Sequence, residues 1–157
     1  MKISIMSRRA LEKLSERGLP RGTAVISITD FGEGQVEMAS EPDFLLRLAF
    51  DDVDSDVFSG ADQKDVSEIE EKYHVMTEGQ AREIADFFAD VSGVAQTLIC
   101  QCEHGQSRSA AVAAAILEHR SRRGIGIFAD DRYFPNKLVF RRTLSALRKT
   151  EREEAPR

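Results

Sequence analysis

The chain has no tryptophan, only two cysteines and no long hydrophobic run. Cys100 and Cys102 are separated by one residue, which is too close for an ordinary disulfide along a strand, so a disulfide scaffold is excluded and a reducing compartment suits both thiols. No apolar run approaches the roughly 18 residues of a membrane span. Residues 1–9 contain a short apolar stretch followed by charge, unlike a secretory signal. These absences predict a cytoplasmic protein without a membrane partner.

An excess of basic residues is also missing. The formal net charge is −5, so no overall positive field attracts nucleic acid or an anionic membrane. Basic side chains do gather late in the sequence. They are Arg120, Arg122, Arg123, Arg132, Lys137, Arg141 and Arg142. This group fits either a solvated helix end, where cations complement the helix dipole, or a patch that attracts a phosphorylated substrate.

A length of 157 residues, with 41% hydrophobic and 31% charged residues, fits one globular domain with a substantial core. The sequence shows no internal repeat and no linker. We therefore predict a single domain over residues 1–150 and a charged C-terminal tail over 151–157.

Hydrophobic periodicity predicts strands that alternate with helices. Strands are expected at 2–6, 23–29, 44–50 and 97–100, and helices at 8–17, after Thr77 as far as Gly93, from Ser109 onward and from Pro135 onward. Ser7 and Thr77 can cap their helices, and Gln80 stands at the capping-box position after Thr77. Residues 66–73 fit either a helical turn or a mobile loop. The alternation predicts an α/β fold with a central, mostly parallel sheet flanked by helices.

One stretch combines a strand, a polar loop and a helix. The apolar residues 97–100 lead to Cys102, the polar residues 103–108 suit a turn, and the segment from Ala110 to Leu117 is strong helix material. A thiol at the end of a strand, facing the start of a helix, is in a setting that favours the thiolate. The same helix N-terminus can bind a phosphate group.

Three further residues suit this chemistry. Arg108 can hold two phosphate oxygens at once, and Gly105 lets the backbone turn in and approach a ligand. Ser109 can donate a hydrogen bond to the sulfur of Cys102. The set predicts nucleophilic attack of a thiolate on phosphorus.

The segment Cys102-Glu103-His104-Gly105-Gln106-Ser107-Arg108-Ser109 resembles the Cys-x-x-Gly-x-x-Arg-Ser/Thr signature of the cysteine-dependent protein tyrosine phosphatases, most closely their compact dual-specificity branch. The resemblance implies hydrolysis of phosphate monoesters of phosphotyrosine, phosphoserine or phosphothreonine type through a phosphocysteine intermediate. It implies Cys102 as nucleophile, the loop from Glu103 to Arg108 as the phosphate-binding site, and Ser109 as the aid to phosphocysteine breakdown. It requires neither a metal nor an organic cofactor.

The family also implies an aspartate general acid on a separate loop, after a strand that precedes the cysteine. Asp52 is our choice by position, with Asp51 and Asp54 in reserve. The same acids also fit a solvated strand end or a helix cap.

Some residues depart from the family pattern. Gln101 stands where the family usually has histidine, and it cannot carry that charge. The loop has no lysine, and Glu103 with His104 argues against a highly charged phosphoinositide headgroup. Without tryptophan there is no Trp-Pro-Asp loop. The alternative is therefore a weak or inactive phosphate-binding module.

A metal site at Cys100, Cys102 and His104 is disfavoured, because three ligands at this spacing lack a distant partner pair. The expected partner is a phosphorylated protein or a small phosphate ester. The sequence leaves open both the particular substrate and the oligomeric state.

Overall fold

Four parallel strands form the centre of the computed structural model, which describes residues 1–154. They lie in the order β1-β4-β2-β3. The strands are β1 (Lys2–Ser7), β2 (Thr23–Thr29), β3 (Phe44–Ala49) and β4 (Thr97–Cys102). The α/β class and the parallel sheet predicted from the sequence are confirmed. Strand β4 extends two residues beyond the prediction, so Cys102 itself is the last residue of the strand.

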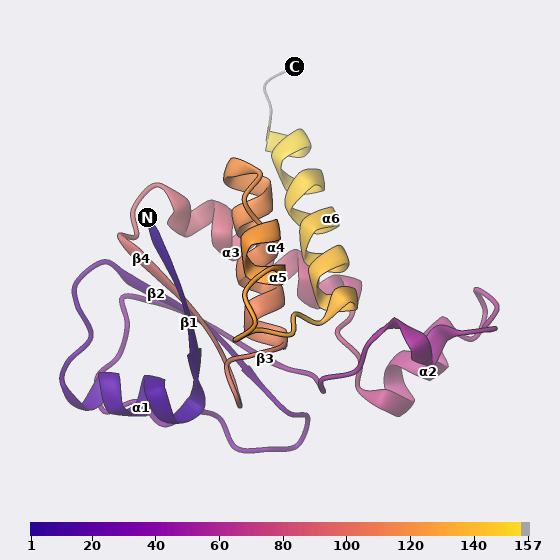
Figure 1. Cartoon of the computed structure of the whole chain (residues 1–157), viewed down its shortest axis with the longest axis horizontal. Coiled ribbons are helices and arrows are strands. Elements are labelled where there is room, and N and C mark those ends of the chain that lie inside the picture. Colours follow the sequence, from indigo (N-terminus) through magenta and orange to yellow (C-terminus); the bar gives the residue numbers. More distant parts are fainter. Residues whose placement is uncertain (155–157) are drawn as a thin grey trace.

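Helices cover both faces of this sheet (Figure 1). One face carries α1 (Arg8–Glu16), whose Leu11 packs in a small cluster with Val25 and Ile99. The other face carries the larger core and three helices. These are α3 (Glu78–Ser92), α4 (Arg108–Ser121) and α6 (Lys137–Glu154). Helix α4 is buried over its first nine residues because it lies against the sheet and α6, which explains its run of alanines.

The connection between β3 and α3 leaves the body of the fold, where α2 stands to one side (Figure 1). It contains the 3-10 helix η1 (Ser55–Phe58) and α2 (Val66–Tyr73). Of the two alternatives for residues 66–73, a helical turn or a mobile loop, the structure shows the helix. A short helix, α5 (Ile125–Phe128), lies between α4 and α6. Neither η1 nor α5 was predicted, because four residues are too few to show a helical period.

The predicted helix caps are present. The Ser7 hydroxyl accepts a hydrogen bond from the Ala10 amide at 3.2 Å, and Thr77 with Gln80 forms a complete capping box. Helix α6 begins two residues later than Pro135 suggested and continues through Glu154, so the first four residues of the predicted tail are helical. Residues 155–157 lie outside the described part of the chain. No helix within the described residues is long and apolar enough to cross a bilayer.

Asp54 fastens the start of α6 to the loop after β3. Its carboxylate accepts hydrogen bonds from the amides of Ser55, Lys137 and Leu138, at 2.6, 3.1 and 3.1 Å. Burial works to raise the pKa of Asp54, but these hydrogen bonds outweigh it and hold the pKa below its usual value of 3.8. The charged carboxylate is therefore the form that the fold stabilises.

Replacement of this carboxylate is expected to destabilise the fold in a pH-dependent way. Asp54→Ala should lower the free energy of unfolding by about 1 kcal/mol at pH 7, since it removes the acceptor for the first amides of α6. Because the pKa is lower in the folded state, the difference from wild type is full above pH 3.8 and shrinks as pH falls through the folded-state pKa. Urea unfolding at pH 7 and at pH 3 measures it. The exposed Asp56→Ala is the matched control; an equal loss in both variants would contradict the cap.

Candidate active site

All four strands deliver polar residues to one edge of the sheet, because the strands are parallel and their carboxyl ends coincide. Arg8 follows β1, Asp30 follows β2, Asp52 lies shortly after β3, and β4 ends in Cys102. Ligands of open parallel sheets bind at this edge. The residues of the predicted signature thus meet side chains from every other strand.

The loop from Glu103 to Ser107 joins the end of β4 to the start of α4. The Sγ atom of Cys102 lies 3.0 Å from the hydroxyl oxygen of Ser109, and both residues are buried. Ser107 makes no capping hydrogen bond to the first turn of α4. The amides at this N-terminus are therefore not occupied by a cap, and the helix dipole favours an anion beside them.

Gly105 holds the loop against the first strand. Its φ is +67°, a left-handed conformation, and a Cβ there would lie 2.6 Å from the Met6 carbonyl carbon and the Ser7 nitrogen. The sequence predicted a close approach of Gly105 to a ligand. The structure adds a close approach to the backbone of β1. Only glycine tolerates both the left-handed conformation and the lack of space for a Cβ atom.

Arg8, the first residue of α1, provides a second link to this loop, one that sequence reasoning missed. Its Nε atom forms an ion pair with the Glu103 carboxylate at 2.8 Å, and its amide donates to the Glu103 carbonyl at 3.2 Å. A further guanidinium nitrogen donates to the Gly34 carbonyl at 2.7 Å. Glu103 is thus held to the side of the loop by α1.

Arg108 is fixed from one side only. One terminal nitrogen donates to the Phe50 carbonyl at 2.7 Å and forms an ion pair with Asp30 at 2.6 Å. The Nε atom is buried and has no hydrogen-bond partner. Leaving such a donor unpaired is costly, so this geometry suits a ligand with oxygen acceptors. Asp30 was predicted only as part of a turn; its place directly after a buried strand was the available signal.

Asp52 contacts the candidate loop directly. Its Oδ1 atom accepts hydrogen bonds from the Ser107 hydroxyl at 2.8 Å and from the side-chain amide of Asn136 at 2.9 Å. Both hydrogen bonds use the same oxygen, which leaves Oδ2 without a partner among the described residues. The side chain is exposed, as a group that meets a substrate must be.

The two reserve aspartates have structural partners instead. Asp51 accepts a hydrogen bond from the Phe31 amide at 2.8 Å and lies 3.3 Å from a ring nitrogen of His74. Asp54 holds the start of α6, as described above. Asp54 therefore acts as a helix cap, one of the roles that fit these acids. Of the three aspartates, only Asp52 forms a hydrogen bond with the loop that follows Cys102.

Asn136 is a further residue of the site that the sequence analysis missed. It is buried, and its side chain also donates to the Val53 carbonyl at 3.1 Å and accepts from the Val139 amide at 3.0 Å. It thus caps α6 and positions Asp52 together. Its place after Pro135 signals a helix start, but nothing local in the sequence signals the contact with Asp52.

The segment before α6 also closes on the loop. The Phe134 amide donates to the carbonyl of Gln106 at 2.9 Å, while the side chains of Gln106 and His104 are exposed. The backbone of Gln106 is therefore fixed by the segment before α6. Neither the Gln106 nor the His104 side chain makes a hydrogen bond within the described residues.

Gln101 and Cys100 lie beneath the loop in β4, fully buried. The Gln101 side chain accepts a hydrogen bond from the Ser27 hydroxyl at 2.7 Å, and its Nε2 atom is buried without a partner. Gln101 therefore ties β4 to β2 as a neutral group. Burial, and secondarily the nearby Cys102, raise the pKa of Cys100 to about 12. Both cysteines are free thiols, and no group of three or more metal-ligating side chains occurs within residues 1–154.

The sequence matches no protein-family model and no curated protein sequence. Its structure does match solved ones. PTPMT1 in complex with PI(5)P superposes with a TM-score of 0.55 at 13% identity, over 98% of this chain and 95% of that chain. A second PTPMT1 structure gives 0.54 at 16% identity, over 97% and 94% of the two chains. Human DUSP28 gives 0.50 at 17% identity, over 97% and 95%.

These similarities extend over nearly the whole chain, so they concern the complete fold and not only the loop after β4. The fold is that of the cysteine-dependent protein tyrosine phosphatases, in their dual-specificity-phosphatase-like form. The resemblance found in the signature from Cys102 to Ser109 is thus confirmed for the fold.

Proposed function

We propose that this chain is a cysteine-dependent phosphatase that hydrolyses phosphate monoesters of phosphotyrosine, phosphoserine or phosphothreonine type. The observation that carries the proposal is the hydrogen bond between Asp52 and Ser107. It brings a carboxyl group from the loop after β3 to the loop that joins Cys102 to Arg108. A nucleophile, a phosphate-binding loop and an acid then surround one position.

In the first step, the thiolate of Cys102 attacks phosphorus. A phosphorus–sulfur bond forms while the bond to the leaving oxygen breaks, and the Oδ2 proton of Asp52 passes to that oxygen. The unpaired Nε atom of Arg108 and the amides of the loop hold the equatorial oxygens, where negative charge gathers in the transition state. The ion pair with Asp30 keeps the guanidinium in this orientation.

In the second step, water attacks the phosphocysteine. Asp52, now a carboxylate, accepts a proton from the water as the new phosphorus–oxygen bond forms and the phosphorus–sulfur bond breaks. Inorganic phosphate leaves and the Cys102 thiolate is restored. Ser109 stabilises this leaving thiolate by donating a hydrogen bond over the 3.0 Å that separates its oxygen from the sulfur. The cycle calls for no metal and no organic cofactor.

The surroundings of the loop favour a phosphorylated protein or a small phosphate ester as substrate. A hollow of about 520 Å³ beside the loop is lined by five acids and one cation. They are Glu12, Asp30, Glu33, Glu37 and Glu103, with Arg8. This charge repels a headgroup that carries several phosphates. PTPMT1 has been crystallised with PI(5)P; we propose that such lipids are poor substrates here.

A catalytically weak or inactive phosphate-binding module is the second candidate, and Gln101 favours it. A neutral, buried glutamine bonded to Ser27 cannot supply a positive charge beneath the thiolate. Phosphate binding depends on Arg108 and the loop amides, which this change does not touch. A protein with Gln101 at this position could therefore lose catalysis and still bind phosphate.

Turnover of p-nitrophenyl phosphate separates the two candidates. The phosphatase proposal expects steady release of p-nitrophenol, competitive inhibition by vanadate and a phosphorylated cysteine in acid-quenched samples analysed by mass spectrometry. Vanadate or phosphate binding by calorimetry, with no turnover, would establish the binding module instead. Neither turnover nor binding would overturn both.

A further inference from the structure

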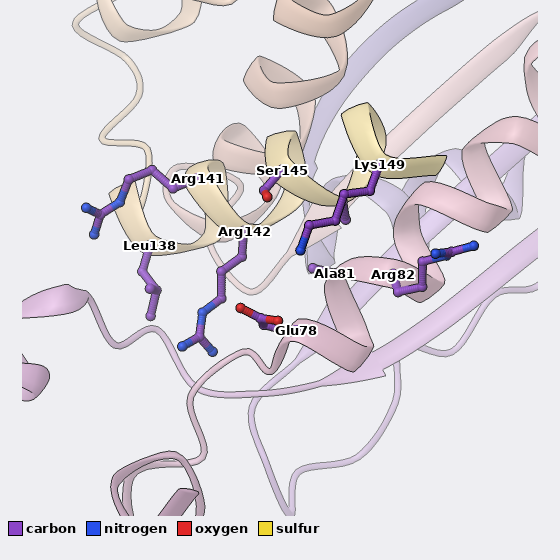
Figure 2. Close-up of a pocket in the computed structure, with 9 residues that line it drawn as sticks. Glu78, Ala81, Arg82, Leu138, Arg141, Arg142, Ser145 and Lys149 are labelled. Carbon is purple, nitrogen blue, oxygen red and sulfur yellow. The ribbon is translucent and has the colours of Figure 1, made fainter. Parts of the chain in front are cut away.

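A basic groove lies between α3 and α6 (Figure 2). These helices cover the face of the sheet opposite α1 (Figure 1). It has a volume of about 350 Å³. Four cations and one acid line it, on a protein whose net charge is −5. The charged residues are Arg82, Arg141, Arg142, Lys149 and Glu78. The floor is apolar, because Ala81, Leu138 and Ala146 are buried beneath these charges.

Two of the four cations are already neutralised by partners. Arg142 forms an ion pair with Glu70 at 2.5 Å and donates to the Met76 carbonyl. Arg82 pairs with Asp86 and Glu153, each at 2.7 Å. These pairs hold the two guanidinium groups in place and reduce their attraction for a ligand.

Arg141 and Lys149 are the free cations of the groove. Both are exposed, and neither forms an ion pair within the part of the chain that the structure describes. They stand four residues before and after Ser145 on α6, so all three side chains share one helix face. Figure 2 shows Lys149 reaching from α6 toward the side of the groove that carries Glu78.

The positive surface continues along α6. A neighbouring hollow of about 300 Å³ shares Arg141, Ser145 and Lys149 and adds the cations Arg148 and Arg152. A row of cations above an apolar floor is complementary to a chain segment with several carboxylates and an occasional apolar side chain. Within the described residues, the exposed large hydrophobic side chains all lie elsewhere. They are Phe31, Tyr73, Val94, Ile125 and Phe134. Insertion of this face into a membrane would need such side chains beside the cations.

The groove begins close to the candidate active site. Leu138, which lines it, donates its amide to Asp54, and Asn136, two residues earlier, contacts Asp52. From Leu138 to Lys149 the helix rises about 16 Å. A peptide whose phosphorylated residue occupies the loop after Cys102 can therefore extend past the start of α6 into the groove.

We propose that this groove binds an acidic segment of the phosphorylated protein substrate, through Arg141 and Lys149. The proposal rests on the phosphatase function given above and specifies its substrate class. It also fits the charge on the opposite side of the site, where the hollow beside Arg8 is acidic. A substrate that is acidic on the α6 side only would bind in one direction.

Matched phosphotyrosine peptides test this docking. Each carries a neutral spacer of five residues, about 17 Å when extended, followed by six glutamates or six serines. Because exposed ion pairs are individually weak, we expect about a three- to tenfold higher kcat/KM for the glutamate peptide at low salt. Arg141→Glu with Lys149→Glu should remove this preference and leave turnover of p-nitrophenyl phosphate unchanged.

Lys13→Glu with Arg17→Glu is the matched control, because it makes the same change of net charge at α1 and its C-cap, on the other face of the sheet. The preference should survive there. No preference in wild type, or an equal loss in both double variants, would overturn the docking role. So would retention of the preference in the groove variant, or binding to phosphatidylserine vesicles that needs Arg141 and Lys149 without any peptide preference.

Fluorescence anisotropy of the labelled peptides keeps this test separate from catalysis. If p-nitrophenyl phosphate is not turned over, the phosphatase function fails, yet tighter binding of the glutamate peptide that depends on Arg141 and Lys149 still supports the groove. Equal binding of both peptides overturns the groove whatever the activity.

Discussion

Cys102→Ser is expected to abolish turnover of p-nitrophenyl phosphate, with a fall in kcat of about 10⁴- to 10⁶-fold, as for other enzymes that lose their nucleophile. A serine hydroxyl in this place is neutral at working pH and attacks phosphorus poorly without a general base beside it. Steady-state kinetics measures the loss. Because Arg108 and the loop amides are unchanged, vanadate or phosphate should still raise the thermal unfolding temperature of the variant.

Cys100→Ala is the matched control for this experiment. Cys100 lies two residues earlier in the same strand, is fully buried, and has a pKa raised to about 12 by burial and secondarily by Cys102. It is protonated at neutral pH and faces the core, so its removal should cost stability and leave kcat nearly unchanged. Comparable loss of activity in both variants would point to a fault of folding. Retained turnover in Cys102→Ser would remove the proposed nucleophile.

Asp52→Asn is expected to lower kcat by about 10²- to 10³-fold for a phosphate ester with a poor leaving group. The amide keeps the shape of the side chain and can still accept from Ser107 and Asn136, but it has no proton to give to the leaving oxygen. Nitrophenolate departs without such help more readily than phenolate. The loss should therefore be larger for phenyl phosphate than for p-nitrophenyl phosphate.

Asp54→Asn and Asp51→Asn make the same chemical change within two residues of Asp52. Asp54 binds the first amides of α6, and Asp51 binds the Phe31 amide and faces His74. Both variants are expected to retain kcat within about threefold and to keep the same dependence on leaving group, because neither carboxylate bonds to the loop of Cys102. A leaving-group-dependent loss in either one, with little change in Asp52→Asn, would transfer the acid role to that residue.

Local sequence signals predicted much of the fold because they depend on neighbouring residues. The cap at Ser7 and the capping box at Thr77 and Gln80 are satisfied within three residues, and both are present. Strand β2 has the predicted bounds because every residue from Thr23 to Thr29 is buried and most are β-branched or apolar. The short helices η1 and α5 were missed because a single turn carries no period.

The residues of the candidate site also fall into those that local sequence predicts and those that only the fold brings together. Cys102, Arg108 and Ser109 lie within eight residues, so the chain itself brings them together at the junction of β4 and α4. Asp30 and Asn136 are far from them in sequence, and their contacts with Arg108 and Asp52 arise only when parallel strands align and α6 packs beside α4. The basic groove is also tertiary, since its walls come from α3 and α6.

The sequence by itself determined the α/β class and the loop that carries the signature, because strand, turn and helix signals, and the thiol–arginine spacing, are properties of short contiguous segments. Only the tertiary structure distinguishes the surroundings of Asp51, Asp52 and Asp54. Three acids in one short segment cannot be distinguished by their sequence positions, but in the fold each carboxylate contacts a different partner. Asp51 finds Phe31 and His74, Asp54 finds the amides of α6, and Asp52 finds Ser107. That separation depends on elements which meet only after the sheet has formed.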